Sequence, residues 1–513
     1  MKKRLTLGFA LLLCVTLVLG GLSGASAAQE GWLVDQETVL DVMMSESSLV
    51  PLSNDFTYYQ LLYEKTGIKI NFMAVPSSDF NTKKSLVLST NDLPDIMLVG
   101  QSDLNLYATE DLFVNLSDHA AELPNFFEIV ERYPVAKTTY IDGSAYAFPT
   151  LARWDMLRGS SLILRQDILD ALGIDSASIK TFEDFFGVMQ QVKAAHPDMV
   201  PFITRGGASN QMMILGYALG SGSGITYDPQ MEKWCYEPAR PETKDVLAYL
   251  NRMYVEGLLD PDYATLASNE WQQKMANNQG FAYFDNVNFA NTNLAALQSI
   301  VPEAVWSVIP VPLNSFGYSR AIYTNPHQIS RLWVIASKST KIDAALKLFN
   351  ELYTEEACDL LNLGVEGVDF YRNEAGECLL TDEVIAKYST DGVFVKTAMQ
   401  AVCGNAAYET FIPYSDNRAY FIQVPEHQLA WYTTIQNDPA FALPVNPPPF
   451  TEDERDELSE ITTGVNTIAT EMFDKLIMGL DSLDNFDVYA QSMKEAGAER
   501  IEEIYNAAQA RMQ

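Results

Sequence analysis

Polar and aromatic side chains that could bind a ligand follow several strands that the sequence predicts. Loops after the carboxyl ends of strands are where α/β proteins usually place ligand-contacting groups. Carboxylate, amide and guanidinium groups make paired hydrogen bonds to a ligand, and aromatic rings cover its apolar faces. The candidates selected in this way are Glu46, Ser47, Gln101, Asp103, Arg153, Trp154, Arg205, Asn210, Asp285 and Asn286, and we add Trp333 and Trp431 from later apolar or aromatic segments.

These candidates also have structural interpretations. Tryptophan is more often a core residue than a ligand platform, and Trp333, in an apolar run, fits a core position best. Trp154 lies between two charged residues and is the strongest candidate for stacking on a ligand. Asp103 and Asp285 are also consistent with helix caps. The Arg-Gly-Gly sequence that begins at Arg205 is consistent with a simple turn or with a carboxylate-binding loop.

Motifs for catalysis or metal binding are largely absent from the sequence. It contains no G-x-S-x-G, H-E-x-x-H, P-loop or D-x-[DN]-x-[DN]-G calcium loop. The four histidines are isolated, and the spacing of His119 and Glu122 is more typical of a solvated face than of a metal site. Carboxylates are numerous, but their spacing singles out no glycosidase-like pair. We therefore predict a binding protein with no cofactor and no bound metal.

The charge of the chain excludes a nucleic-acid ligand. The 513 residues carry a formal net charge of −33, and the basic residues are scattered. Phosphate contacts need clustered lysine and arginine, so such a ligand is not expected. An anionic small molecule would need a local basic pocket. Hydrophobic residues make up 48% of the chain, which is enough to build more than one core.

The N-terminus has the features of an export signal. A basic start at residues 2–4 precedes a mostly apolar run at residues 5–19, and Ala25-Ser26-Ala27 fits the small-residue cleavage rule. We predict a signal peptide at 1–27, a mature chain from about Ala28, and an extracytoplasmic location. Cys14 lies inside the apolar run rather than after it, which argues against a lipid anchor.

Four further cysteines would remain in the exported chain. They are Cys235, Cys358, Cys378 and Cys403, and none has CxxC spacing. An exported protein with this content is expected to form one or two disulfides, although the sequence does not choose among the three possible pairings.

Strand and helix patterns alternate along most of the chain. In the first part the predicted strands are 38–44, 68–73 and 95–99, and the helices between them are 58–65 and 79–88. Further strands are predicted at 161–164, 280–284 and 305–310, and helices at 181–195, 244–255 and 342–353. The chain after residue 451 has almost continuous helical periodicity. This order predicts two α/β lobes followed by a helical C-terminal region.

A series of short phrases, in a fixed order, resembles the extracellular solute-binding proteins of carbohydrate ABC importers, in particular their branch of about 500 residues. The phrases are YEKTGI at 63–68, LPDI at 93–96, DGSAYAFP at 142–149, RQDIL at 165–169, YVEGLLDP at 254–261, GVEGV at 364–368 and IMG at 477–479. Each is weak alone, and their joint order is the signal. The sequence departs from the pattern of this family in two places: it has no lipobox, and it has Ser144 where lysine is usual.

The resemblance implies a Venus-flytrap receptor. Two α/β lobes would close around a ligand held between them. We expect lobe 1 to comprise 37–150 and 325–385 and lobe 2 to comprise 151–318 and 390–513, with a last crossing near 380–392. The ligand implied is a mono- or oligosaccharide, the partner is the permease of an ABC importer, and the receptor is expected to be monomeric.

Two alternatives remain at this stage. A receptor for a peptide or organic anion would bind through a basic pocket around Arg153, Arg205 or Arg331. A secreted carbohydrate-active enzyme would need a carboxylate pair in a fixed cleft.

Overall fold

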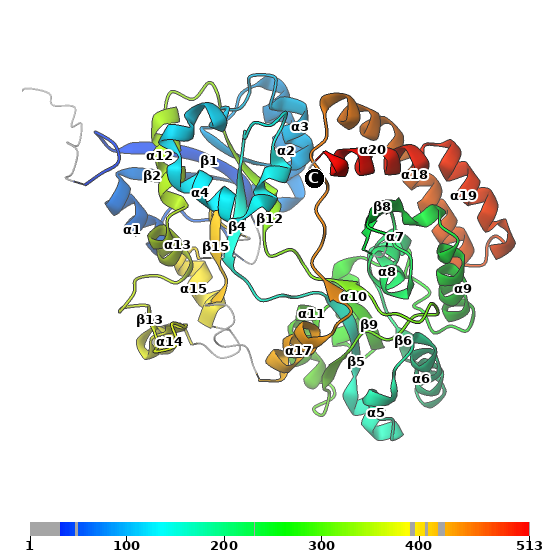
Figure 1. The fold of residues 1–513 in the computed structure, drawn as a ribbon. Coiled ribbons are helices and arrows are strands. Elements are labelled where there is room, and N and C mark those ends of the chain that lie inside the picture. The colour runs from blue at the N-terminus through cyan, green and yellow to red at the C-terminus, as the bar shows by residue number, and fades with distance from the viewer. Residues whose placement is uncertain are drawn as a thin grey trace, which may run out of the picture.

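The computed structural model of the chain describes residues 31–46, 50–229, 231–389, 395–405, 409–418 and 426–511. These residues form two α/β units and a helical C-terminal region (Figure 1), which confirms the two-lobed fold class predicted from the sequence. The predicted signal peptide and Ser47 lie outside the described residues. In the part of the chain that is described, no helix combines the length and the apolar composition needed to cross a bilayer.

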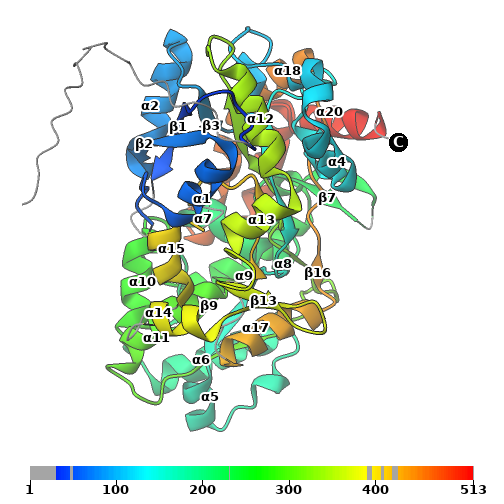
Figure 2. The same cartoon turned by 90° about the vertical axis from the view of Figure 1, so that its left-hand side faces the viewer.

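A six-stranded sheet forms the centre of the first unit, in the order β15-β4-β12-β3-β1-β2. Its strands are β1 (Thr38–Glu46), β2 (Ile68–Pro76), β3 (Ile96–Val99), β4 (Phe148–Trp154), β12 (Gln328–Ile335) and β15 (Tyr414–Asp416). β12 runs antiparallel to both neighbours, and the other strands run parallel to one another. The surrounding helices are α1 (Thr57–Thr66), α2 (Ser77–Thr90), α3 (Gln101–Tyr107), α4 (Pro124–Arg132), α12 (Ile342–Leu352), α13 (Glu355–Asn362), α14 (Asp382–Tyr388) and α15 (Val395–Cys403), as both views show (Figures 1 and 2). A small hairpin of β13 (Phe370–Arg372) and β14 (Cys378–Leu380) completes the unit.

A four-stranded sheet forms the centre of the second unit, in the order β10-β5-β9-β6. Its strands are β5 (Ser160–Arg165), β6 (Val200–Phe202), β9 (Gly280–Asn286) and β10 (Trp306–Ile309), and β5 runs antiparallel to both neighbours. The helices are α5 (Gln166–Leu172), α6 (Phe182–Ala195), α7 (Gly207–Gln211), α8 (Tyr217–Leu219), α9 (Glu242–Val255), α10 (Ser268–Ala276), α11 (Asn288–Gln298) and α17 (Glu426–Asn437). Two strand pairs are added, β7 (Ile225–Asp228) with β8 (Lys233–Tyr236) and β11 (Ala321–Ile322) with β16 (Phe441–Ala442).

The C-terminal region consists of α18 (Glu452–Ile477), α19 (Phe486–Glu495) and α20 (Ala498–Ala510). These helices lie beside β8 and α9 of the second unit (Figure 1). Buried side chains of α18 and α19, such as Phe473 and Met493, join the core of that unit. The predicted C-terminal helical periodicity therefore extends the second unit rather than forming a separate domain.

Local signals in the sequence set several helix ends. α1 ends at Gly67, which adopts a φ of 73° and donates its amide hydrogen to the Tyr63 carbonyl. α6 and α18 begin after Thr181 and Thr451, whose side chains accept the amide hydrogen three residues later in capping boxes. These ends agree with the glycine stop and the capping signals in the sequence.

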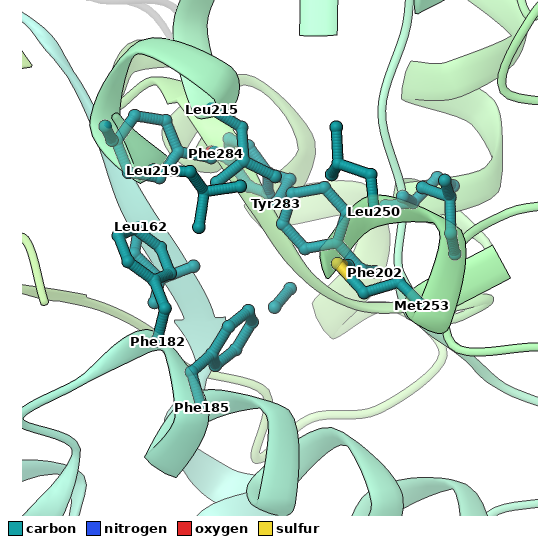
Figure 3. Close-up of a cluster of buried hydrophobic side chains, with 14 of the residues drawn as sticks. Leu162, Phe182, Phe185, Phe202, Leu215, Leu219, Leu250, Met253, Tyr283 and Phe284 are labelled. Carbon is teal, nitrogen blue, oxygen red and sulfur yellow. The ribbon is translucent and has the colours of Figure 1, made fainter. Parts of the chain in front are cut away.

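Each sheet has a separate hydrophobic core. The first core draws its side chains from residues 34–151 and 332–414, and the second from 162–323 and 431–501. Part of the second core is shown in Figure 3, where Phe182 of α6 lies on the side of Leu162 in β5, and Leu250 and Met253 of α9 lie on the side of Phe202 in β6. Two cores in one chain indicate two structural units.

The last crossing between the units differs from our expectation. We expected it near 380–392, but Val395 and Met399 of α15 pack in the first core and β15 pairs with β4. Local periodicity does not show which of two cores an apolar segment joins. We therefore propose that 34–154 and 328–416 form the first unit, that 160–323 and 426–510 form the second, and that 155–159, 324–327 and 417–425 connect them.

The expected disulfides are not formed. All four cysteines of the described chain are free and buried: Cys235 in β8, Cys358 in α13, Cys378 in β14 and Cys403 in α15. Each lies in a different packed element, so shielding from solvent accounts for their burial without a covalent partner.

Trp333 is a core residue, and its assignment as a ligand contact is wrong. It lies in β12, between β3 and β4, with 0% of its surface exposed. Its ring packs edge-on against Phe411 at a centroid distance of 4.7 Å. A central strand with helices over both faces has no solvent-facing position for such a side chain.

Replacement of Trp333 by alanine should destabilise the first unit strongly. Loss of a buried aromatic side chain leaves a cavity, and we expect the free energy of unfolding to fall by about 3–5 kcal/mol. Urea titration followed by far-UV circular dichroism measures this change. The control is Leu86→Ala on α2, where Leu86 is 56% exposed. Equal stability of the two variants would contradict the core assignment.

Candidate functional site

Two sheet edges gather most of the polar candidates. In the first unit the parallel strands β1, β3, β4 and β15 all end at one edge, which we call the first edge. In the second unit β6, β9 and β10 end at one edge, where β5 begins, and we call this the second edge. Carboxyl ends of strands are the usual ligand side of α/β sheets.

The first connecting segment holds the two edges near each other. β4 ends at the first edge, β5 begins at the second edge, and only five residues separate them. A fully extended chain of that length keeps the two strand ends within roughly 20 Å. The second segment also starts from the second unit and enters β12 at the first edge. The chain itself therefore limits the distance between the end of β4, where Arg153 and Trp154 lie, and the start of β5 at the second edge.

Arg153, at the end of β4, contacts three carboxylates. Its Nε lies 2.8 Å from Asp416 Oδ2, one terminal nitrogen lies 2.5 Å from Asp359 Oδ1, and the other lies 2.8 Å from Glu355 Oε2. Arg418 also contacts Asp416, with its Nε 2.9 Å from both carboxylate oxygens. We call these five residues the arginine–carboxylate cluster. Arg132 also contacts Glu355, and Arg372 also contacts Asp359. These two outer arginines pair in addition with Glu128 and Glu366. The four guanidinium groups are therefore matched by five carboxylates, and the cluster with its outer partners presents no excess positive charge.

Asp416 is the buried centre of this cluster. Burial alone would raise the pKa of its carboxyl, but hydrogen bonds from Arg418 and the charge of Arg153 outweigh burial and hold this pKa below its ordinary value. The carboxylate therefore stays ionised and connects β15 to β4 at the first edge.

At the second edge, Arg205 and Asp285 form a paired contact. Arg205 Nε lies 2.8 Å from Asp285 Oδ2, and a terminal nitrogen donates to Oδ1 at 3.3 Å. The guanidinium carbon lies 4.8 Å from the centre of the Phe289 ring. Asn210 donates to the Arg205 carbonyl at 3.0 Å, and Asp285 also accepts the amide hydrogen of Asn286 at 2.7 Å. The structure thus brings all four second-edge candidates together in one hydrogen-bonded group.

Trp154 follows Arg153 at the end of β4 and has intermediate exposure. The carbonyl of Trp154 accepts the amide hydrogen of Asn417 at 3.0 Å, which ties the strand end to the third connecting segment. Among the seven tryptophans, Trp32 shares this partial exposure, and the buried ones are Trp234, Trp271, Trp306, Trp333 and Trp431. Trp154 is therefore the tryptophan that the structure places at the first edge.

The other first-edge candidates make local contacts. Glu46 accepts the amide hydrogen of Leu52 at 2.9 Å, and Gln101 donates to Asn105 at 2.9 Å. Asp103 accepts the amide hydrogen of Gly100 at the start of α3 and pairs with Lys84 at 2.5 Å. Asp103 thus has the helix-capping role that its sequence position allowed.

Trp431 is also a core residue. It lies on α17 with 5% of its surface exposed, and its indole nitrogen donates to the Trp306 carbonyl at 3.2 Å. The prediction that it contacts the ligand is wrong because α17 packs against β10 of the second sheet.

The sequence reasoning missed the partners of Arg153. Glu355 and Asp359 are four residues apart and share one face of α13, a spacing that could have identified them as a pair. Their partner lies about two hundred residues earlier in the chain, so no local pattern joins them. His327, in the second connecting segment, was also missed; its Nδ1 accepts the amide hydrogen of Ala152 at 3.1 Å. Burial lowers the pKa of His327, which favours the neutral form that can accept this bond.

No metal site is evident in the described residues, where no three or more His, Cys, Asp or Glu side chains are grouped to hold an ion. The cluster carboxylates are instead neutralised by arginines. The arrangement can offer fixed hydrogen-bonding groups and one aromatic side chain to a ligand.

Comparison with known proteins identifies the family of this chain. A family model described as bacterial extracellular solute-binding protein matches residues 48–357, more than half of the chain. Lipoprotein LipO of Bacillus subtilis is 23% identical over 331 residues, which cover 60% of this chain and 63% of LipO. The fructooligosaccharide ABC transporter substrate-binding protein FusA of Streptococcus pneumoniae is 23% identical over 367 residues, which cover 66% of this chain and 65% of FusA. The matches thus span slightly less than two thirds of these relatives.

A solved structure shares the fold over nearly the whole chain. The alginate-binding protein AlgQ2, solved without calcium ion, superposes with a TM-score of 0.73 at 19% sequence identity. The superposition covers 94% of this chain and 99% of the AlgQ2 chain. At this level of identity the likeness establishes the fold alone.

Replacement of Asp416 should test the cluster through stability and pH. The folded protein lowers the pKa of Asp416, so the ionised carboxylate adds stability that is complete above the unfolded-state pKa of about 3.9. This stability is lost as the pH falls below that value and through the folded-state pKa. At pH 7, Asp416→Asn should lower the free energy of unfolding by about 1–3 kcal/mol, because it removes the carboxylate partner of Arg418 and one of the three carboxylate partners of Arg153.

Urea titrations at pH 7 and at several pH values below 4 measure both effects. Between pH 7 and the acidic values, the free energy of unfolding should fall less in the variant than in the wild type, because the variant has no Asp416 carboxylate to protonate. The control is Asp343→Asn, which removes an exposed pair with Lys347 on α12 and should change stability little. A variant as stable as wild type at pH 7 would show that the cluster does not hold β15.

Proposed function

The chain belongs to the bacterial extracellular solute-binding protein family, and from this premise we propose that it captures a carbohydrate outside the cytoplasm and delivers it to the transmembrane subunits of an ABC importer. The proposed role is that of a transport receptor with no catalytic step. FusA, a sequence relative, is named for binding fructooligosaccharide, and AlgQ2, a structural relative, for binding alginate. Both names support a carbohydrate ligand.

The observation that most supports this proposal is that two sheet edges rich in polar side chains are joined by the short first connecting segment. The first edge offers Trp154 beside the arginine–carboxylate cluster, and the second offers Arg205 and Asp285 with adjoining amides. A sugar ring has apolar C–H faces that stack on aromatic rings and hydroxyl groups that need oriented donors and acceptors. Side chains held in ion pairs are oriented in advance, so less conformational entropy is lost when a ligand binds.

In the proposed mechanism the ligand first docks on one edge, and closure of the units then brings the other edge onto it. The described connecting segments, 155–159 and 324–327, would absorb the hinge motion. Ligand can shift the balance between open and closed forms only by binding the closed form more tightly. The closed arrangement would then create the surface that the permease recognises.

We propose that the receptor acts as a monomer in an extracytoplasmic location. The relative LipO is named a lipoprotein, and an anchored receptor would serve the same function. The position of Cys14 within the N-terminal apolar run, rather than after it, favours an unanchored form.

A thermal-shift screen is the first test of the proposed function. The chain from Ala28 onward is heated with mono- and oligosaccharides, acidic saccharides, peptides and organic acids. A ligand that binds only the folded protein raises the melting temperature. We expect one saccharide class to raise it and to be recovered intact. A shift with peptides or organic acids alone would overturn the carbohydrate assignment, and consumption of the saccharide would indicate an enzyme.

Replacement of Trp154 by alanine should weaken saccharide binding. If the ring stacks on the sugar, its loss should cost about 1–3 kcal/mol of binding free energy. Isothermal titration calorimetry with the saccharide found in the screen measures the change in Kd. Trp32→Ala is the control, because Trp32 is partly exposed but packs beside Tyr63, far from the first edge. An unchanged Kd for the Trp154 variant would remove this residue from the site.

A further inference from the structure

We infer that the ligand is an uncharged saccharide rather than a uronic acid or another anion. This inference rests on the proposed function and narrows it. The relatives do not decide the point, because alginate is a polyanion whereas fructooligosaccharides carry no charge. The charge of the ligand is instead indicated by the carboxylates that pair with the arginines at the two edges.

At the first edge, the nitrogens of Arg153 point to carboxylates on three sides. An incoming anion would have to displace Glu355 or Asp359, or lie beside them and be repelled. Arg418 is bound to Asp416 in the same way. Arg372 is bound to Asp359 at 2.6 Å. Arg132 pairs with Glu355 at 2.9 Å and with Glu128 at 3.2 Å. The described arginines that contact the cluster carboxylates are thus already matched by acidic side chains.

At the second edge, Arg205 is matched by Asp285. The two oxygens of this carboxylate take the Nε and one terminal nitrogen of the guanidinium, and Ser268 accepts from the other at 3.2 Å. This geometry uses the paired donors with which arginine would otherwise bind a ligand carboxylate. An acidic sugar would compete with a partner that is already held in place.

The remaining charges near the edges point the same way. Arg158 in the first connecting segment pairs with Asp155 at 2.9 Å. The net charge of −33 also repels an anion at long range.

A neutral saccharide meets none of these penalties. Its hydroxyl groups can donate to carboxylate lone pairs that the arginines leave unused, and they add no charge to the site. Such hydrogen bonds to an ionised acceptor are stronger than those between neutral groups. The carboxylates that exclude an anion therefore become acceptors for a neutral sugar.

Calorimetry with matched ligands tests the inference. The protein is titrated with neutral fructo-, galacto- and xylo-oligosaccharides and with oligomers of alginate and galacturonate of equal length. We expect binding in the neutral set only, with a Kd that changes little between low and high salt. Binding in the uronate set alone would overturn this inference and leave the proposed function standing. Binding in neither set would overturn both.

A charge-removing variant tests the role of the pairing directly. Asp285→Asn leaves Arg205 without its carboxylate, so uronate affinity should rise at least on the order of tenfold, from no measurable binding in wild type to a measurable Kd in the variant. The matched control is Glu183→Gln, which removes the same charge from a similar two-bond pair with Arg252 on α6 and α9. An equal effect of the two variants on uronate binding would overturn the inference at the second edge.

A second variant keeps the test valid if Asp285→Asn does not fold. Glu355→Gln removes one partner of Arg153, and the Glu355 side chain is 54% exposed, so its replacement should be tolerated. Glu355→Gln should also raise the affinity for uronate, as Asp285→Asn does. No rise in uronate affinity with either variant would overturn the inference.

Discussion

The Asp416 carboxylate, held between Arg153 and Arg418, fixes the last strand of the first sheet. β15 has only three residues, so its backbone hydrogen bonds alone give it little hold on β4. The ion pair with Arg153 joins β15 to β4, the pair with Arg418 holds the chain just after β15, and Tyr414 of the same strand packs in the first core. The edge of the sheet and the start of the third connecting segment therefore depend on one buried charge and its two partners.

This contact has a topological consequence. The first sheet is completed by β12 and β15, which come after the second unit has been built. The chain must therefore cross between the units three times, and each crossing begins or ends at the edge that holds the candidate site. Short segments with both ends fixed allow rotation of one unit against the other but limit their separation, which is the condition for hinge closure around a ligand.

The same charges also determine the proposed preference for an uncharged ligand. Arginines at both edges are oriented by carboxylates, and the guanidinium of Arg205 also packs on the ring of Phe289. Such pairs cost desolvation energy when they are buried, so their value lies in geometry more than in stability. They place donors and acceptors in fixed positions while leaving the site without excess positive charge, a combination suited to a hydroxyl-rich neutral molecule.

The sequence by itself determined the class of fold and the family, because alternating strand and helix periodicity, glycine stops and threonine caps are local properties, and the ordered phrases extend along the chain. It also placed Trp154, Arg205 and Asp285 at strand ends. Only the tertiary structure decided that Trp333 and Trp431 are buried and that residues 395–416 join the first unit. It alone paired Arg153 with Glu355, Asp359 and Asp416. These outcomes depend on contacts between segments hundreds of residues apart, and local patterns report which face of an element is apolar but not which partner covers it.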